Sequence, residues 1–396
     1  MSPNTKERQP VIYSILDSPA YGGAEEYVLS NLYYFAQVGY PVVLATNNSL
    51  VKTIAQSIIQ QRQLDTFSII SFPFVLDAIG NWKGLIKFFI AAPIALLWQG
   101  LTFYHLRKKH KDIFCYWAGF SDRLLLSPIA SLFCTKIIWI EFGPLEPTFK
   151  KNFGFPKQLY QLMQRLPQKI ITISQYTRTS IVKNSNISHE NITIIYPGIQ
   201  LNQPMTVPKH TTSPSIFTVC YVGRLAEESE IALLIQAFDI FHNNFHEKSR
   251  LVVMGDGPQK KELMQLSEST SSKNDIIFTG FVSQDQKYKT IANANAFIFP
   301  RAWTLEGFGI STIEGMGMGV PTIAPNFGPQ KEIITHKYNG LLFEPHNAPD
   351  LAEKLFELAR SPHLQRSLAL AGKQTVERKF SIKRMHAQTA KVISQL

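Results

Sequence analysis

Short runs of β-branched and aromatic residues alternate with helical patterns along most of this chain. Such alternation is typical of parallel sheets with crossover helices and disfavours a β-sandwich or a helical bundle. An amphipathic helix is expected from about Ala24 to Val38, and strands are expected at residues 11–16, 42–46, 113–117, 136–140, 169–173 and 191–196. Ligands of an open parallel sheet bind at the loops that follow its strands, so functional residues are expected there.

The pattern breaks once, after Tyr196. The following residues, PGIQLNQPMTVPKHTTSP, are rich in Pro, Thr and other polar types without periodicity, as in a linker. Alternation then restarts, with strands expected at residues 216–223, 251–255, 276–280 and 296–300. The sequence therefore predicts two doubly wound α/β domains, at residues 1–200 and 215–375. We place the linker at 201–214 and a helical tail, which packs back on the first domain, at 376–396.

Three cysteines, Cys115, Cys134 and Cys220, are too few and too scattered for a disulfide framework or a cysteine metal site. They fit a reducing compartment. The polar residues 1–9 lack the features of a secretory signal. We therefore expect a cytoplasmic protein.

Positive charge is concentrated in the first half of the chain. Residues 1–200 hold 19 Lys and Arg against 11 Asp and Glu, whereas residues 201–396 hold 21 against 18. A basic surface suits nucleic acid, anionic lipid or a phosphorylated substrate. Helix-turn-helix, zinc-finger and RNA-recognition patterns are missing, so nucleic acid is not expected as a partner. A lipid or phosphorylated acceptor and an ordinary solvated surface remain as alternatives.

Residues 82–111 bear on this choice. They are apolar for about twenty residues, with interruptions at Lys87, Pro93 and Gln99, and end in a basic cluster. A spanning helix needs roughly 20 nearly uninterrupted apolar residues, so this stretch is marginal as a span. Its aromatic residues and basic end favour a helix at an anionic membrane surface. The alternative is a core helix of the first domain with a solvated basic end, and both interpretations stay open.

Glycines and one arginine stand in two expected strand-ending loops. Gly22 and Gly23 follow the first strand, where glycine lets the backbone approach a ligand and a helix N-terminus offers N–H groups to an anion. A Gly pair in such a loop is more often a simple turn, and the pattern is not the G-x-G-x-x-G of dinucleotide sites. Arg224 ends the first strand of the second domain. Its planar cation suits a diphosphate, and an interdomain salt bridge is the alternative.

The most specific segment is EGFGISTIE, in which Glu306 and Glu314 stand at its two ends. Its Gly-Phe-Gly loop and the helix expected from about Ser311 can cradle a phosphate through backbone N–H groups. Glu306 can accept hydrogen bonds from sugar hydroxyls, and Glu314 can accept them from a ribose. A metal site is the competing interpretation, but no His, Cys or further Asp clusters beside the pair in the sequence, and no metal is expected.

This segment resembles the E-x7-E motif of glycosyltransferase family 4, a family of retaining enzymes. Seven further segments resemble the family in the same order along the chain: 22–46, 222–225, 231–238, 253–263, 276–286, 293–301 and 339–345. The resemblance covers most of the chain and implies the GT-B fold, with two Rossmann-like domains facing each other across a cleft. It also implies a retaining, metal-independent hexosyltransferase without a cofactor. Such an enzyme transfers a sugar from a nucleoside diphosphate donor to an acceptor.

The resemblance assigns roles to particular residues. Arg224 and Glu306 are implied as catalytic, the first on the donor diphosphate and the second on the transferred sugar, while Glu314 holds the ribose. The peptide around Phe281 meets the nucleotide base, and the N–H groups of Phe308 and Gly309 assist at the sugar. The implied donor-binding residues are Gly22, Gly23, Arg224, Phe281, Val282, Glu306, Gly307, Phe308, Gly309, Ile310 and Glu314.

Two positions depart from the family's pattern. Ser229 stands where the family usually has a Lys on the diphosphate, and Phe142 stands where many members have a His on the donor sugar. Arg301 or Lys331 could replace the missing cation. The chain could therefore instead be a weak or inactive relative that serves as a binding or scaffolding subunit. A phosphorylase of the same fold is a minor alternative.

The acceptor is expected on the basic first domain. A lipid-linked acceptor, or an intermediate of a polysaccharide or glycoconjugate, fits the charge and residues 82–111. The expected location is then the cytoplasm or, as a peripheral protein, the inner face of a membrane.

Overall fold

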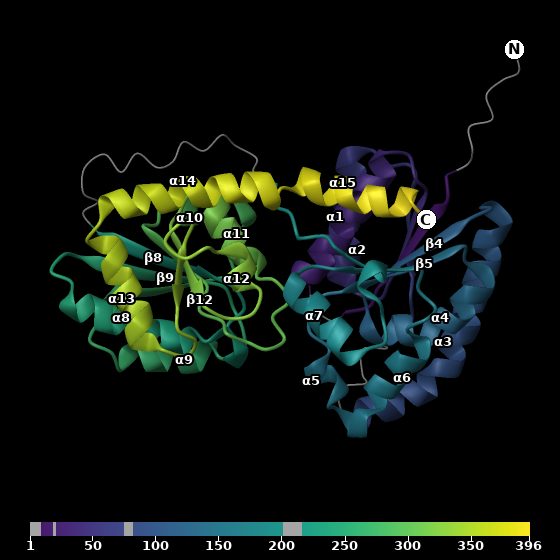
Figure 1. The fold of residues 1–396 in the computed structure, drawn as a ribbon, viewed down its shortest axis with the longest axis horizontal. Coiled ribbons are helices and arrows are strands. Elements are labelled where there is room, and N and C mark those ends of the chain that lie inside the picture. The colour runs from purple at the N-terminus through teal and green to yellow at the C-terminus, as the bar shows by residue number, and fades with distance from the viewer. Residues whose placement is uncertain (1–8, 19–20, 75–81, 201–215) are drawn as a thin grey trace, which may run out of the picture. The chain divides into compact units, whose positions relative to one another are not determined.

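The computed structural model describes residues 9–18, 21–74, 82–200 and 216–396. The chain forms two compact units, one of Met1–Tyr196 with Met385–Leu396 and one of Pro197–Arg384 (Figure 1). The linker predicted at 201–214 and most of the polar N-terminal residues lie outside the described residues. Unit 1 and unit 2 below denote these two groups.

Unit 1 contains a seven-stranded parallel sheet in the order β3-β2-β1-β4-β5-β6-β7. Its central strands are wholly buried runs, as expected where helices cover both faces of a parallel sheet. In register, Ile12 of β1 lies opposite Val42 of β2, and Val11 lies opposite Ile113 of β4. The strands are β1 (Val11–Leu16), β2 (Val42–Thr46), β3 (Phe67–Ser71), β4 (Ile113–Trp117), β5 (Lys136–Glu141), β6 (Lys169–Thr172) and β7 (Ile192–Ile194).

The helices of unit 1 begin where side chains can satisfy free backbone N–H groups. Asn48 caps α2 by accepting from the amides of Leu50 and Val51, and Ser174 caps α7 by accepting from Thr177. The helices are α1 (Gly23–Gln37), α2 (Ser49–Arg62), α3 (Trp82–Lys109), α4 (Phe120–Phe133), α5 (Glu146–Phe149), α6 (Phe155–Met163), α7 (Gln175–Asn184) and α15 (Ile382–Ser394), with 3-10 turns η1 (Asn152–Gly154) and η2 (His189–Asn191).

Two of the cysteines are neighbours, which their sequence spacing did not indicate. The sulfurs of Cys115 on β4 and Cys134, at the end of α4, lie 3.2 Å apart as free thiols. The sequence did not predict this proximity, because the two residues stand 19 positions apart. Burial raises the pKa of the Cys115 thiol, so it stays protonated at neutral pH.

Unit 2 contains a six-stranded parallel sheet in the order β10-β9-β8-β11-β12-β13. Figure 1 shows α8 and α13 on one side of this sheet and α11 and α14 on the other. The strands are β8 (Phe217–Val222), β9 (Ser249–Met254), β10 (Ile276–Gly280), β11 (Ala296–Ile298), β12 (Thr322–Pro325) and β13 (Leu341–Phe343). The helices are α8 (Ile231–Asn244), α9 (Lys260–Glu268), α10 (Gln284–Ala292), α11 (Ile310–Gly317), α12 (Gln330–Ile333), α13 (Ala348–Ala359) and α14 (Pro362–Lys379), with 3-10 turns η3 (Glu227–Ser229) and η4 (Lys273–Asp275).

Both sheets confirm the predicted fold class, since each is wholly parallel and each reverses its strand order once. The reversal lies between β1 and β4 in unit 1 and between β8 and β11 in unit 2. The tail differs in its starting point from the predicted residue 376. Helix α14 continues unbroken to Lys379, and the chain rejoins unit 1 at Met385.

Candidate functional site

The loops after β8, β9 and β10 are joined by backbone hydrogen bonds. The amide of Gly223 donates to the carbonyl of Met254 at 3.0 Å, and the amide of Gly255 donates to the carbonyl of Gly280 at 2.9 Å. Gly255 has φ +139°, and a Cβ there would lie 1.9 Å from the carbonyl oxygen of Gly223, so glycine is required. These bonds place the residues after the three strands on one edge of the sheet, beside its strand-order reversal.

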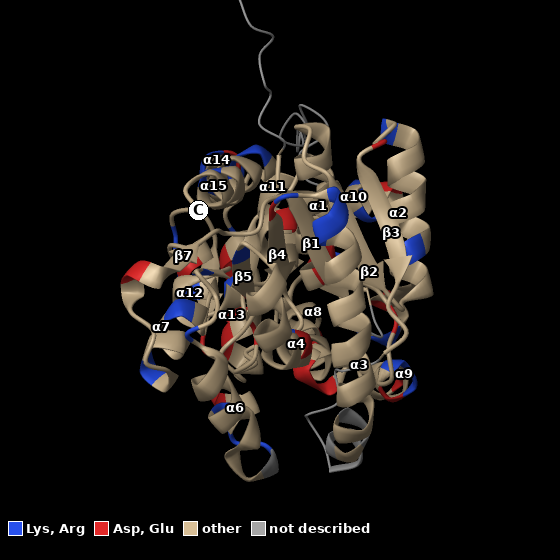
Figure 2. Ribbon diagram, turned by 90° about the vertical axis from the view of Figure 1, so that its right-hand side faces the viewer, with Lys and Arg blue, Asp and Glu red and all other residues tan. Residues whose placement is uncertain are grey.

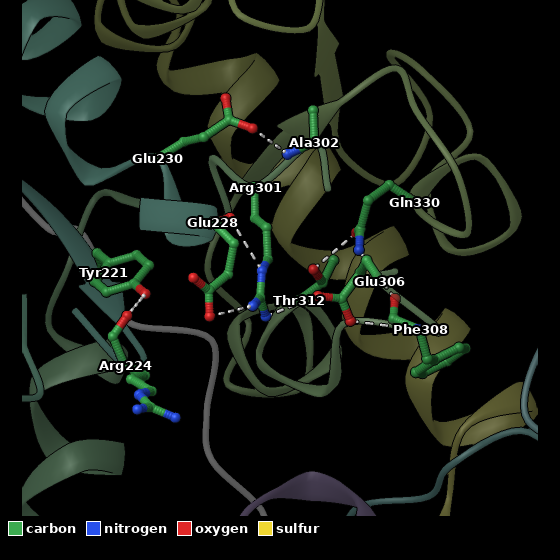
Figure 3. A network of polar contacts seen from close by, with 10 residues as sticks. All are labelled: Tyr221, Arg224, Glu228, Glu230, Arg301, Ala302, Glu306, Phe308, Thr312 and Gln330. Carbon is green, nitrogen blue, oxygen red and sulfur yellow. Dashed lines mark hydrogen bonds and ion pairs between the residues drawn. The ribbon is translucent and has the colours of Figure 1, made fainter. Parts of the chain in front are cut away.

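Arg224 extends from this edge. Its carbonyl accepts a 3.1 Å hydrogen bond from the hydroxyl of Tyr221, while its side chain is exposed (Figure 3). Burial raises the pKa of Tyr221 to about 12, so the phenol remains a donor at neutral pH. The guanidinium of Arg224 forms no hydrogen bond or ion pair with any part of the chain that the structure describes. It is therefore a cation available for a ligand.

Glu306 lies in the loop between β11 and α11, where Arg301 orients it. The Nη1 atom of Arg301 lies 3.0 Å from Oε2 of Glu306, and its Nη2 atom lies 3.5 Å from Oε1 of Glu228. The Nε–H of Arg301 also donates to the carbonyl of Glu228 at 3.1 Å (Figure 3). The Glu306 side chain is 13% exposed, so its carboxylate is largely shielded but can be reached.

Arg301 thereby contacts the turn that carries Ser229. Glu228 and Ser229 both belong to η3, and Ser229 itself is buried, with its amide bonded to the carbonyl of Ala226. A guanidinium thus lies against the turn where the sequence shows no cation. Lys331, the other suggested substitute, is exposed on α12.

The Gly-Phe-Gly loop is held by Gln330. Its Nε2 donates to the carbonyl of Phe308 at 2.9 Å, and its Oε1 accepts from the hydroxyl of Thr312 at 2.8 Å. Gly309 has φ +91°, and a Cβ there would lie 2.3 Å from Nε2 of Gln330. The amide of Phe308 points to Oε1 of Glu306 at 3.4 Å. The Phe308 amide thus orients the Glu306 carboxylate, a contact that the sequence did not predict.

Glu314 lies on α11 and is held by α10. The Nζ atom of Lys287 lies 2.6 Å from Oε1 of Glu314, and the hydroxyl of Tyr288 donates to the same oxygen at 3.1 Å. Burial raises the pKa of Tyr288, which keeps its phenol protonated. Because an ionised carboxylate can accept several hydrogen bonds, Oε2 retains the capacity to accept from a ligand.

The remaining predicted residues of unit 2 lie on the same loops. Phe281, which follows β10, is 90% exposed, and Val282 is half-buried. Gly307 is buried and Ile310 begins α11. The structure therefore brings the unit 2 residues of the predicted set to the carboxyl edge of one sheet.

Of the two predicted residues of unit 1, Gly22 has a local partner and Gly23 is the first residue of α1. Gly22 precedes α1, and its amide donates to Oε2 of Glu25 at 2.8 Å. The first turn of α1 therefore already holds a carboxylate where an anion was expected. The ring of Phe142 packs edge-on against Tyr27 with centroids 5.4 Å apart.

Sequence reasoning missed Glu228, Lys287 and Tyr288. Each reaches the site from a segment more than 20 residues away from the carboxylate or guanidinium that it contacts. Glu228 belongs to the acidic run EESE at residues 227–230, but its sequence gave no sign that it is a partner of Arg301.

Comparisons with known proteins relate the chain to glycosyltransferases. Residues 207–375 match the family model described as Glycosyl transferases group 1. The chain is similar to an uncharacterized glycosyltransferase of Methanocaldococcus jannaschii, with 22% identity over 271 residues that cover 66% of this chain and 68% of the relative. It is also similar to the capsular polysaccharide biosynthesis glycosyltransferase CapM of Staphylococcus aureus, with 27% identity over 58% of this chain and 63% of that one. The chain spans about half to two thirds of the length of such relatives.

The fold is similar to that of HepE of Anabaena, solved in complex with UDP and glucose. The TM-score is 0.76 at 17% identity, over 98% of this chain and 100% of that one. The two doubly wound units are therefore those of the GT-B fold. Unit 2 carries the sequence pattern of the glycosyl transferases group 1.

Proposed function

We propose that this protein is a glycosyltransferase that binds a nucleoside diphosphate sugar at the carboxyl edge of the unit 2 sheet. The observation that carries the proposal lies beside the strand-order reversal. There an Arg224 cation without a partner among the described residues stands on the same edge as two oriented carboxylates, Glu306 and Glu314. The match of residues 207–375 to glycosyl transferases supports it. HepE was solved with UDP, so UDP is the first nucleotide to test.

Two guanidinium groups serve the donor diphosphate in this proposal. Arg224 is free to bind it, and Arg301 supplies a second positive charge at the turn that carries Ser229. The 3.5 Å contact between Arg301 and Glu228 is the weaker of its two ion pairs, and a phosphate oxygen can replace it. The leaving diphosphate gains negative charge as the glycosidic bond breaks, so both cations stabilise the transition state.

The two carboxylates bind hydroxyl groups of the donor. Lys287 and Tyr288 fix one oxygen of Glu314, so that the other accepts from the ribose. Arg301 and the amide of Phe308 fix Glu306, whose remaining lone pairs accept from hydroxyls of the transferred sugar. The chain's own part is thus to position the donor and to stabilise charge.

We further propose that the enzyme transfers a hexose, retains the anomeric configuration and needs no metal. The sugar's bond to the diphosphate breaks while its anomeric carbon bonds to the acceptor oxygen, whose proton leaves with the diphosphate. The acceptor we propose is a lipid-linked or polysaccharide intermediate, which fits the capsular role named for CapM and the basic first half of the chain.

A thermal-shift screen against UDP, GDP, ADP and their common sugar conjugates, with and without EDTA, tests this function. Stabilisation by one nucleotide family, unchanged by EDTA, is expected. No shift with any nucleotide at millimolar concentration would overturn the donor site and favour the scaffolding alternative. A shift that EDTA abolishes would contradict metal independence alone.

A further inference from the structure

One face of α3 is apolar and exposed along most of the helix. Ile90 is 69% exposed, Ile94 is 59% exposed and Leu97 is 67% exposed. The exposed residues recur every three or four positions, which places them on one side of a helix. The face, called the α3 apolar face below, consists of Ile86, Ile90, Ile94, Leu97, Leu101 and Tyr104.

The opposite side of α3 is fixed to unit 1. Ala95, Gln99 and Phe103 are buried, and the hydroxyl of Tyr13 donates to Oε1 of Gln99 at 3.0 Å. Phe103 packs edge-on against Tyr13 with ring centroids 5.4 Å apart. Phe89–Lys109 is long and apolar enough to cross a membrane by length and composition, with a mean hydropathy of 1.3. Because one side is packed on the domain, α3 instead suits a position along a membrane surface.

The charge of α3 selects an anionic surface. Its sequence holds no Asp or Glu, and its last turn holds Arg107, Lys108 and Lys109, all exposed. Figure 2 shows blue at one end of the α3 ribbon and no red along it. Two copies of α3 packed face to face would offer these cations no acidic partner from either helix, whichever way the helices run. Anionic headgroups complement this charge.

An exposed aromatic residue of the loop before α6 lies near the start of α3. Phe89 contacts Phe155 of α6, with ring centroids 5.7 Å apart, and Phe153, two residues before it, is 97% exposed. Lys150 and Lys151 precede Phe153 and are part of the same loop region. This loop adds an exposed aromatic residue, preceded by two lysines, near the start of α3, and such a combination is found at membrane interfaces.

We propose that the α3 apolar face and its basic last turn bind unit 1 to an anionic membrane surface, with α3 lying in the plane of the headgroups. The apolar side chains enter the acyl boundary, and Arg107, Lys108 and Lys109 contact anionic headgroups. This surface is separate from the donor site of unit 2 and does not depend on the proposed function.

Co-sedimentation of the full chain with vesicles tests the proposal. The vesicles are phosphatidylcholine alone or phosphatidylcholine with phosphatidylglycerol, at low and high salt. We expect binding to the anionic vesicles that weakens with salt. The variant Ile90→Gln/Ile94→Gln/Leu97→Gln should lower the partition coefficient by about tenfold or more. The control Met264→Gln/Leu370→Gln, which replaces exposed apolar residues of unit 2, should leave it unchanged.

Charge is tested separately with Arg107→Gln/Lys108→Gln/Lys109→Gln, which should remove the preference for anionic vesicles. Each variant is shown to be folded if a nucleotide raises its melting temperature as much as that of the wild type. If no nucleotide binds, an unchanged melting temperature serves the same purpose. Absence of vesicle binding, or equal binding by the apolar variant, would overturn the proposal. So would light scattering that shows a dimer dispersed by the apolar variant, because the face would then bind a second copy.

Discussion

The guanidinium of Arg301 bridges two carboxylates, with Nη1 3.0 Å from Oε2 of Glu306 and Nη2 3.5 Å from Oε1 of Glu228. It also stacks over Trp303, with Cζ 4.6 Å from the ring centroid. Arg301 therefore fixes the carboxylate proposed to hold the sugar and places positive charge beside η3. Its removal would leave the shielded Glu306 carboxylate and the more exposed Glu228 carboxylate without this cation.

Arg301→Gln should lower kcat/KM by about tenfold or more, because a charge-assisted contact contributes about 1.5 to 3 kcal/mol. Arg301→Lys keeps the charge but cannot hold both carboxylates with one planar group, so an intermediate loss is expected. Arg360→Gln, which removes an arginine stacked on Phe356 at the end of α13, serves as the control. Full activity of Arg301→Gln would show that this residue serves only the fold.

The two carboxylates should differ in their kinetic effects. Glu306→Gln should depress kcat more than nucleotide affinity, because its contact is to the transferred sugar. Glu314→Ala should weaken nucleotide binding itself, as measured by calorimetric titration with the free nucleoside diphosphate. The reverse pattern would show that the two assignments are exchanged.

Gly309→Ala should destabilise unit 2. The residue has φ +91°, and its new Cβ would lie 2.3 Å from Nε2 of Gln330, so backbone strain and a clash add to about 2 kcal/mol or more. Gly39→Ala is the matched control, since its φ is +95° and nothing lies within 4 Å of the added Cβ. Denaturant unfolding should show a larger loss for Gly309→Ala than for Gly39→Ala. Adding Gln330→Ala should relieve part of the excess, and equal losses would rule out the clash.

His386 should make stability depend on pH. Its ring stacks on Tyr34 with centroids 4.6 Å apart, and its Nε2 lies 2.9 Å from the hydroxyl of Ser30. Burial lowers the pKa of His386 from 6.5 to about 4. The unfolded chain then binds a proton more readily between these values, so stability falls as pH drops through this window and levels off below it.

The measurement is chemical unfolding at pH 7 and pH 4.5 for the wild type and His386→Gln. Because the ring is partly exposed, its contribution to the pH dependence is expected to be about 1 kcal/mol. The variant should lose that part of the dependence. An identical pH dependence in both proteins would contradict a half-buried histidine that is neutral in the folded state.

Local patterns in the sequence predicted the fold well where strands are buried. Residues 11–16, 42–46 and 113–117 are buried strands with the predicted bounds, because continuous apolar runs mark strands between helical layers. The edge strand β3 was missed because its polar and half-exposed residues resemble a loop. The short strands β12 and β13 gave too few residues for a pattern.

The site was predictable only in part, because its carboxylates are marked by local sequence but their partners are not. Glu306 and Glu314 stand out through their spacing and the glycines between them, and both lie on the predicted loop and helix. Their partners come from distant segments: Lys287 and Tyr288 from α10, and Glu228 from η3. Such non-local contacts depend on strand order, which a single sequence does not specify.

Calorimetric titration of the wild type and Arg224→Ala with the nucleoside diphosphate selected by the screen tests the central claim most directly. Arg250→Ala is the control, because Arg250 lies near the amino end of β9, at the opposite edge of the same sheet. Loss of the free cation should weaken binding by about tenfold or more, while the control keeps the wild-type affinity. Equal affinity in all three proteins would contradict a donor site at the carboxyl edge of unit 2.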